Sequence, residues 1–242
     1  MMGMPPDHDE VRTPNPDRSM RAFIPKRFGS REEAGRALAK RLAGHTATDA
    51  VVIALPKGGA AVGAEIARML RLPFDVLLMD RITVPGCGET PLGAITSGGV
   101  RMLNLAMIDR LHLSDDVVRG AVLRKALRLA RRESFYRSRR PSVEVADRTV
   151  ILADDGTASC ATLRSAIRLL HRQHAEHVVV AVPVACRHAA CDLRMEADEV
   201  VTLEEPSVEI SAARWFRSFP PATTAEVLRI LSGKFEADGH QH

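Results

Sequence analysis

Two adjacent aspartates, Asp154 and Asp155, end an apolar stretch that begins TVILA at residue 149. Two carboxylates this close repel each other unless a metal ion, hydroxyl donors or a cation shares them. The vicinal diol of a sugar together with Mg²⁺, held directly or through water, would satisfy both groups. We therefore interpret the pair as candidate catalytic and metal-binding residues. An ordinary strand end with an aspartate cap is the alternative.

Small residues follow the acidic pair from Gly156 to Thr162, and a helical pattern begins directly after them. Backbone N–H groups at a helix N-terminus bind anions, and hydroxyl groups here add donors. The predicted phosphate-binding residues are Ala158, Ser159, Cys160, Ala161 and Thr162. A cysteine at a position that requires φ > 0 would be strained by roughly 1–2 kcal/mol. An activated thiol is the alternative to a space-filling role for Cys160.

A second candidate anion loop is Lys57-Gly58-Gly59, which follows the apolar run VVIALP at 51–56. The two glycines tolerate φ > 0, so the backbone could present N–H groups to an anion beside the lysine. Two phosphate loops that flank a diol-binding acidic pair describe phosphoribosyl pyrophosphate (PRPP) better than a nucleoside triphosphate. GxxxxGK[ST] and GxGxxG loops are absent from the sequence.

The elements that must position these loops alternate between strands and helices. Short apolar runs predict buried strands, and periodic stretches between them predict helices. This order indicates an α/β fold with a doubly wound, Rossmann-like parallel sheet, and ligands are expected beyond the carboxyl ends of the strands. The predicted strands are 51–56, 74–79, 149–154, 178–184 and 199–203.

Composition sets the domain organisation. Of the 242 residues, 45% are hydrophobic and 4% aromatic, which suits one α/β domain with an aliphatic core. We predict a disordered tail at 1–22 and a single domain at 23–242, with a flexible, hairpin-like excursion at 80–113 and a hood at about 185–222. No apolar run reaches the ~18 residues of a membrane span. The unpaired cysteines suit a cytoplasmic protein.

The most basic segment is a predicted helix over 114–140, for which we expect Leu123, Leu127 and Ala130 to point inward. A solvated helix face is the favoured interpretation of its arginines, and a nucleic-acid surface is the alternative. Arg132 and Glu133 could instead border the candidate site.

Several of these stretches together resemble one family. VILADDGTASCAT resembles the PRPP-binding motif of type I phosphoribosyltransferases, and LPKGG resembles their pyrophosphate loop. The chain is more specifically similar to a bacterial phosphoribosyltransferase family. The similarity covers about residues 26–232, and the matching motifs, in order, are PKGG, DRITVPG, ETPLGAI, RRESFYRSRRP, ADDGTASCAT and WFRSF.

The resemblance implies Mg²⁺-dependent transfer of a phosphoribosyl group from PRPP to an unidentified acceptor. Within it, Lys57, Gly58, Gly59 and Arg81 hold pyrophosphate, the acidic pair holds the ribose hydroxyls and Mg²⁺, and residues 158–162 hold the 5′-phosphate. Glu89 lies in the excursion that forms a lid, as a candidate base or as a solvated acid. We expect a homodimer.

Two further points concern the acceptor and the activity. Trp215 and Phe216 of the hood could stack on an acceptor, or could pack the hood against the sheet.

Asp80 replaces a family cation, and the lost attraction and the added repulsion are each on the order of 1 kcal/mol near a phosphate. A weak or inactive homologue that binds PRPP or a nucleotide as a regulatory module is therefore the alternative function.

Overall fold

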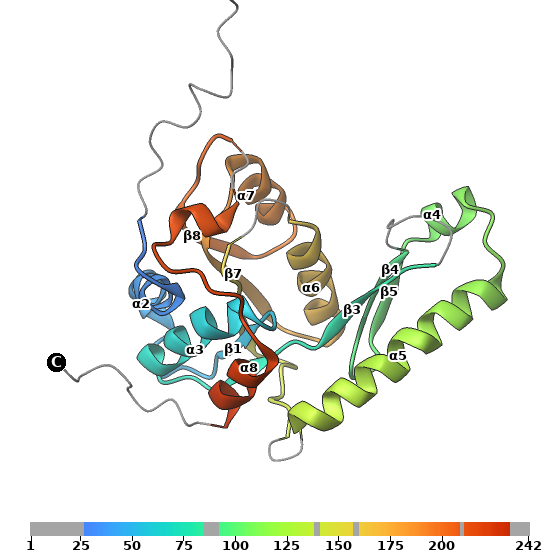
Figure 1. Ribbon diagram of the computed structural model, residues 1–242, viewed down its shortest axis with the longest axis horizontal. Coiled ribbons are helices and arrows are strands. Elements are labelled where there is room, and N and C mark those ends of the chain that lie inside the picture. Colours follow the sequence, from blue (N-terminus) through green and yellow to red (C-terminus); the bar gives the residue numbers. More distant parts are fainter. Residues whose placement is uncertain (1–26, 85–91, 138–140, 157–159, 209–210, 233–242) are drawn as a thin grey trace, which may run out of the picture.

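The computed structural model describes residues 27–84, 92–137, 141–156, 160–208 and 211–232. The tail predicted at 1–22 lies outside these residues. The centre of the described fold is a five-stranded sheet, and all of its neighbouring strands are parallel (Figure 1). In spatial order the strands are β2 (Phe74–Val76), β1 (Val51–Ala54), β6 (Thr149–Ala153), β7 (His177–Val184) and β8 (Glu199–Glu204).

Helices cover both faces of this sheet, as the alternating sequence pattern predicts. Val52 and Ala54 of β1 point into one core, whereas Val51 and Ile53 point into the other. This alternation is the period-2 geometry of a strand that is buried on both faces. The first face carries α2 (Arg31–Arg41), α3 (Gly58–Leu70) and α8 (Thr224–Leu231), and the second carries α6 (Ala161–Arg172) and α7 (Arg187–Arg194).

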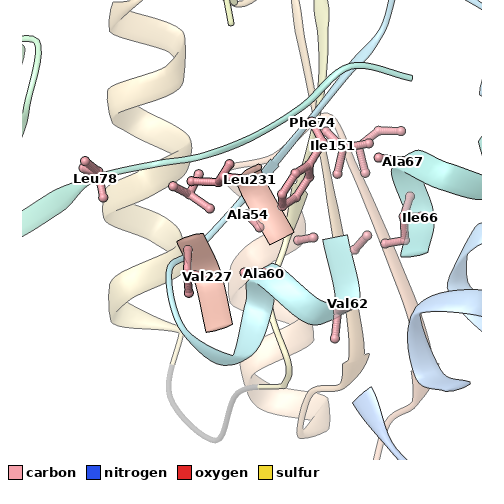
Figure 2. Packing of buried hydrophobic residues seen from close by; sticks show 14 of the residues in the cluster. Ala54, Ala60, Val62, Ile66, Ala67, Phe74, Leu78, Ile151, Val227 and Leu231 are labelled. Atoms are coloured by element: carbon pink, nitrogen blue, oxygen red, sulfur yellow. The ribbon is translucent and has the colours of Figure 1, made fainter. Parts of the chain in front are cut away.

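Helix α8 brings the C-terminal part of the described chain back onto the first face. Thr223 and Glu226 form a capping box at its N-terminus, which fixes where the helix begins. Figure 2 shows Val227 and Leu231 of α8 in the same packed cluster as Ala60 of α3. The C-terminal helix is therefore part of the main core.

The strand predicted at 74–79 is two strands in the structure. Strand β2 ends at Val76, and β3 (Met79–Ile82) belongs to another sheet. The Leu77 N–H still donates to the main sheet, at Ala54 O, whereas Leu78 O accepts from Ser97 N in the second sheet. A continuous apolar run hides this break, because both ends of the run are buried.

The second sheet forms an arm that projects beside the main sheet (Figure 1). It is antiparallel, in the order β3-β4-β5, with β4 at Gly93–Thr96 and β5 at Arg101–Leu103. Helix α4 (Leu105–Arg110) follows β5, and the long helix α5 (Asp115–Arg137) packs on this sheet. The excursion predicted at 80–113 thus contains antiparallel strands, while Glu89 lies outside the described residues.

The buried face predicted for the basic helix is wrong. Leu123 and Leu127 are 59% and 56% exposed, and Ala130 is exposed too. The face that packs on the arm sheet is another stripe at helical spacing, formed by Val118, Ala121, Leu129 and Tyr136. Because apolar residues occur on both faces of the helix, its sequence pattern did not distinguish them.

Two short 3₁₀ helices, η1 (Ala43–His45) and η2 (Ala212–Trp215), complete the secondary structure of the described residues. No helix in this part of the chain combines the length and the apolar character needed to cross a membrane.

Candidate functional site

The acidic pair lies at the carboxyl end of β6, the middle strand of the five-stranded sheet. One carboxylate oxygen of Asp154 accepts a hydrogen bond from the Asp155 N–H at 2.9 Å. The Oδ2 atom of Asp155 accepts from Arg31 Nε at 2.7 Å. The two carboxyl groups have different hydrogen-bond donors, but they also interact with each other and both lie close to the β1–α3 loop.

Asp154 is poised between its neutral and charged forms. Burial of its carboxyl group, followed by the negative charge of Asp155, raises the pKa of Asp154 to about 8. The hydrogen bond from the Asp155 N–H and the charge of Arg31 act in the opposite direction. A second cation at this position would favour the charged form.

Arg31 is the site residue that the sequence did not reveal. It is the first residue of α2, with a buried side chain that reaches Asp155 across the fold. Its Nη1 donates to Pro220 O at 2.7 Å, and its guanidinium carbon lies 3.7 Å from the centre of the Phe219 ring. Arg31 therefore joins the acidic pair to the segment after η2. Arg31 directly follows Ser30, the N-cap of α2, and an arginine in that position is an ordinary surface pattern.

The β1–α3 loop lies directly against the acidic pair. A Cβ atom at Gly58 would lie 1.8 Å from Asp155 Oδ2, and one at Gly59 would lie 2.9 Å from Ala153 O. Both glycines therefore permit the close approach of two loops. The expected role in positive φ is wrong for them, because they form the first turn of α3.

The unusual backbone of this loop falls on Lys57, which has φ 72° and ψ −115° and an exposed side chain. A non-glycine residue with such torsion angles is strained, and strain of this kind occurs at functional sites. Lys57 is thus held at the mouth of the site by the fold around it.

The loop after the acidic pair is described in part. Gly156 has φ +120°, and a Cβ atom there would lie 2.9 Å from Ala212 Cβ, so glycine is required at this turn. The predicted phosphate ligands Ala158 and Ser159 lie outside the described residues. Ala161 and Thr162 are exposed in the first turn of α6, at the helix N-terminus where we expected them.

Cys160 is not strained, contrary to the sequence-based expectation. Its torsion angles, φ −78° and ψ 0°, are ordinary for an L-residue at the start of α6. Its thiol is buried and donates to Asp192 Oδ2 at 3.4 Å. Burial, together with this contact, raises the pKa of Cys160. These features favour the space-filling role over an activated thiol.

Asp80 and Arg81 lie on β3 and have different surroundings. Asp80 faces α5, where its carboxylate pairs with Arg132 Nη1 at 3.0 Å and with Arg128 Nε at 3.6 Å. Its negative charge is therefore offset within the fold, which removes much of the repulsion expected near a phosphate. Arg81 lines a hollow of about 430 Å³ between the arm and α6, whereas Lys57 lines a different hollow beside α5.

The aromatic residues of the predicted hood are used in packing. Trp215 and Phe216 are 7% and 2% exposed and form a cluster with Phe28. The ring of Phe216 lies 4.9 Å from that of Phe219, which in turn contacts Arg31. Their burial favours the packing role over stacking on an acceptor.

Comparisons with known proteins agree with this architecture. A family model described as "Phosphoribosyl transferase domain" matches residues 29–215. "Putative phosphoribosyl transferase Rv0571c" of Mycobacterium tuberculosis H37Rv is 36% identical over 207 residues, which are 85% of this chain and 46% of the relative. "Putative phosphoribosyl transferase MT0597" of Mycobacterium tuberculosis CDC 1551 gives the same values. The chain spans about half the length of these curated relatives.

A solved structure is also similar. The crystal structure of TT1426 from Thermus thermophilus superposes with a TM-score of 0.75 at 34% identity, covering 85% of this chain and 97% of that one. The chain belongs to the phosphoribosyl transferase domain family. This membership confirms the resemblance and the α/β fold predicted from the sequence motifs.

Proposed function

We propose that the chain binds PRPP at the carboxyl ends of β1 and β6 and transfers its phosphoribosyl group to an acceptor. The observation that carries this proposal is the packing of the acidic pair on the glycine turn of the β1–α3 loop. Gly58 packs on Asp155 in that contact, and Lys57 precedes Gly58 in the chain, which supports a site in which a lysine and two carboxylates serve one ligand. A cation beside two carboxylates matches a ribose that bears a diphosphate.

Different residues of the proposed site bind the pyrophosphate, the ribose and the 5′-phosphate of PRPP. Lys57 and the N–H groups of Gly58 and Gly59 bind the pyrophosphate group, because a lysine and a helix N-terminus both favour anions. Asp154 and Asp155 accept hydrogen bonds from the ribose hydroxyls. The 5′-phosphate binds at the start of α6, where the residues are Ala158, Ser159, Cys160, Ala161 and Thr162.

The reaction is a substitution at C1 of the ribose. A lone pair of the acceptor forms the new bond to C1, while the C1–O bond to pyrophosphate breaks and its electron pair leaves with pyrophosphate. A proton carried by the acceptor nucleophile passes to water. Lys57 stabilises the charge that develops on the leaving group, and the bound loops hold the reacting atoms in place.

The acidic pair also suits Mg²⁺. Carboxylate oxygens are the ligands that Mg²⁺ prefers, and it commonly shares one or two of them with water and substrate phosphates. Within the described residues, no group of three or more His, Cys, Asp or Glu side chains could hold a metal ion. Asp154 and Asp155 would therefore hold Mg²⁺ together with PRPP, and the ion would neutralise diphosphate charge.

A second candidate is a regulatory module that binds PRPP or a nucleotide without transfer. The position of Arg81 favours it, because this residue and Lys57 line separate hollows. The leaving pyrophosphate would then have one cation fewer than the sequence motifs imply.

Calorimetry with PRPP and Mg²⁺ tests both candidates. Wild type should bind, and the double variant Asp154→Asn/Asp155→Asn should not. Asp116→Asn, at an exposed carboxylate of α5, is the matched control and should bind like wild type. Pyrophosphate release with any member of a panel of bases and amines would establish transfer, whereas binding without release would favour the regulator. A wild-type chain that does not bind PRPP would exclude both.

We also propose a homodimer in the cytoplasm. Among the described residues, Cys160 and Cys191 carry free thiols, which suits a reducing compartment. Light scattering on purified chain tests the dimer, and cell fractionation tests the location.

A further inference from the structure

The hollow between α5 and the β1–α3 loop is lined mainly by cations and aromatic rings. Its volume is about 520 Å³, within the range of about 300–1,000 Å³ of small-molecule sites. Four cationic side chains and two rings line it, and α8 contributes a polar residue at its edge. The cations and rings are Lys57, Arg128, Arg131, Arg132, Phe135 and Tyr136.

The positive charge in this hollow is only partly neutralised. Asp80 pairs with Arg132 at 3.0 Å and with Arg128 at 3.6 Å. Among the described residues, Lys57 and Arg131 have no carboxylate within the 4 Å of an ion pair, and both are exposed. An anion that entered the hollow would therefore meet two uncompensated cations, with two more beside them. Arginine forks bind phosphate and carboxylate groups with particular geometric fit.

The hollow also adjoins the proposed PRPP site. Lys57 lines the hollow, and the next residue, Gly58, packs directly on Asp155. A ligand in the hollow would thus contact Lys57, whose neighbour in the β1–α3 loop, Gly58, packs on the proposed ribose-binding pair. The rings of Trp215 and Phe216, by contrast, are buried in packing contacts.

We propose that this hollow is the acceptor site and that the acceptor is an anion, a small planar molecule with a phosphate or carboxylate group. Arg131 binds the anionic group, Lys57 separates this group from the proposed pyrophosphate position, and Phe135 and Tyr136 contact the planar body. This inference rests on the proposed function, because an acceptor exists only if a phosphoribosyl group is transferred. Asp80 holds Arg128 and Arg132 in position as their counter-ion.

Matched probes test the charge requirement. Phenyl phosphate and benzoate carry the proposed anionic groups, and benzamide is the uncharged control. Calorimetry on the full chain, saturated with PRPP and Mg²⁺, should show the anionic probes binding at least tenfold more tightly than benzamide. Arg131→Ala should weaken the anionic probes at least fivefold while changing PRPP affinity less than twofold. Arg124→Ala, at an exposed arginine of α5 outside the hollow, should change neither.

The outcomes separate this inference from the function on which it rests. If PRPP binds but the anionic probes bind no better than benzamide, the acceptor site is overturned alone. If Arg131→Ala weakens PRPP as much as the probes, the hollow is part of the pyrophosphate site and the inference is also overturned. If wild type does not bind PRPP, the proposed function fails and the acceptor assignment fails with it, even if phenyl phosphate binds.

Discussion

Two buried arginine–aspartate pairs hold this molecule together, and they differ in which partner is sealed from solvent. In the pair of Asp75 and Arg137, the aspartate is 2% exposed and the arginine 16%. In the pair of Asp155 and Arg31, the arginine is 8% exposed and the aspartate 18%. The first pair closes around the acid, and the second leaves the acid facing the site.

The hydrogen bonds of the two aspartates explain the difference. Both oxygens of Asp75 accept from Arg137 Nη1 at 2.7 Å, and each also accepts a backbone N–H, from Val76 and from Val143. This aspartate has nothing left to offer a ligand, so the pair serves to fasten the end of α5 to β2. Asp155 takes a single bond from Arg31. The same ion-pair chemistry thus supports the arm in one place and the proposed PRPP site in the other.

The largest effect on stability is expected at the pair of Asp75 and Arg137, the closed pair. Asp75→Asn leaves the guanidinium of Arg137 largely buried without its counter-charge, and breaking a buried pair in this way costs about 3–5 kcal/mol. The free energy of unfolding in urea should fall by this amount. Asp116→Asn removes an exposed pair with Arg119 and should change it by less than about 0.5 kcal/mol. Equal effects of the two variants would show that the closed pair is not what fastens the arm.

At the pair of Asp155 and Arg31, the open pair, PRPP binding should be most sensitive to a substitution of Gly58, which packs on Asp155. Alanine there would place Cβ 1.8 Å from Asp155 Oδ2 and 3.0 Å from Arg31 Nε, so the loop and the acid must separate. A misplacement of about 1 Å can cost on the order of 100-fold in the rate of a positioned reaction. PRPP affinity, measured by calorimetry, should also fall clearly, because Asp155 can no longer lie against the loop. Gly44→Ala, where a Cβ meets nothing within 4 Å, is the control, and a loss of affinity there would refute the contact argument.

Arg31 tests whether the open pair orients the acid or only neutralises it. Arg31→Ala removes its bonds to Asp155 and Pro220 and should lower stability by about 1–3 kcal/mol and PRPP affinity by roughly tenfold. Arg31→Lys keeps the charge but lacks the fork that reaches both acceptors. If orientation matters, the lysine variant should resemble the alanine variant in PRPP affinity. Wild-type affinity in the lysine variant would mean that charge alone suffices.

The acid beside the open pair should make binding and stability depend on pH in opposite directions. Because the pKa of Asp154 is raised to about 8, the folded chain holds this proton more tightly than the unfolded chain, in which aspartates titrate near ~4. As the pH rises from about 4 to 8, the unfolded chain loses the proton first, so the free energy of unfolding falls and then levels off.

Binding should follow the opposite slope. A cation competes with the proton on Asp154, so the affinity for PRPP with Mg²⁺ should rise with pH until about 8. Asp154→Asn should remove the contribution of this group to both slopes, which urea denaturation and calorimetry across pH 5–9 can check. A stability slope that is unchanged in Asp154→Asn would assign the titration to another group.

The sequence predicted the alternation of strands and helices, the two loops and the acidic pair, because these depend on local patterns of apolar and small residues. It did not predict the ion pairs of Arg31 and of the arginines that face Asp80. These pairs join distant parts of the chain: Asp155 lies 124 residues from Arg31, and Asp80 lies 52 residues from Arg132. It also chose the wrong buried face for α5. A helix with apolar residues on both faces takes its buried face from its neighbour, and that neighbour is the arm sheet.

The smallest effect is expected at Cys160, on the loop that follows the open pair. At Cys160 φ is −78°, so glycine would relieve no strain there. Cys160→Gly would remove the buried thiol and add freedom to the unfolded chain, which should lower the free energy of unfolding by about 1 kcal/mol. PRPP affinity should change little if the acidic pair and Gly58 define the site. An increase in stability would instead mean that the loop does require a glycine, and that the site depends on more than the open pair.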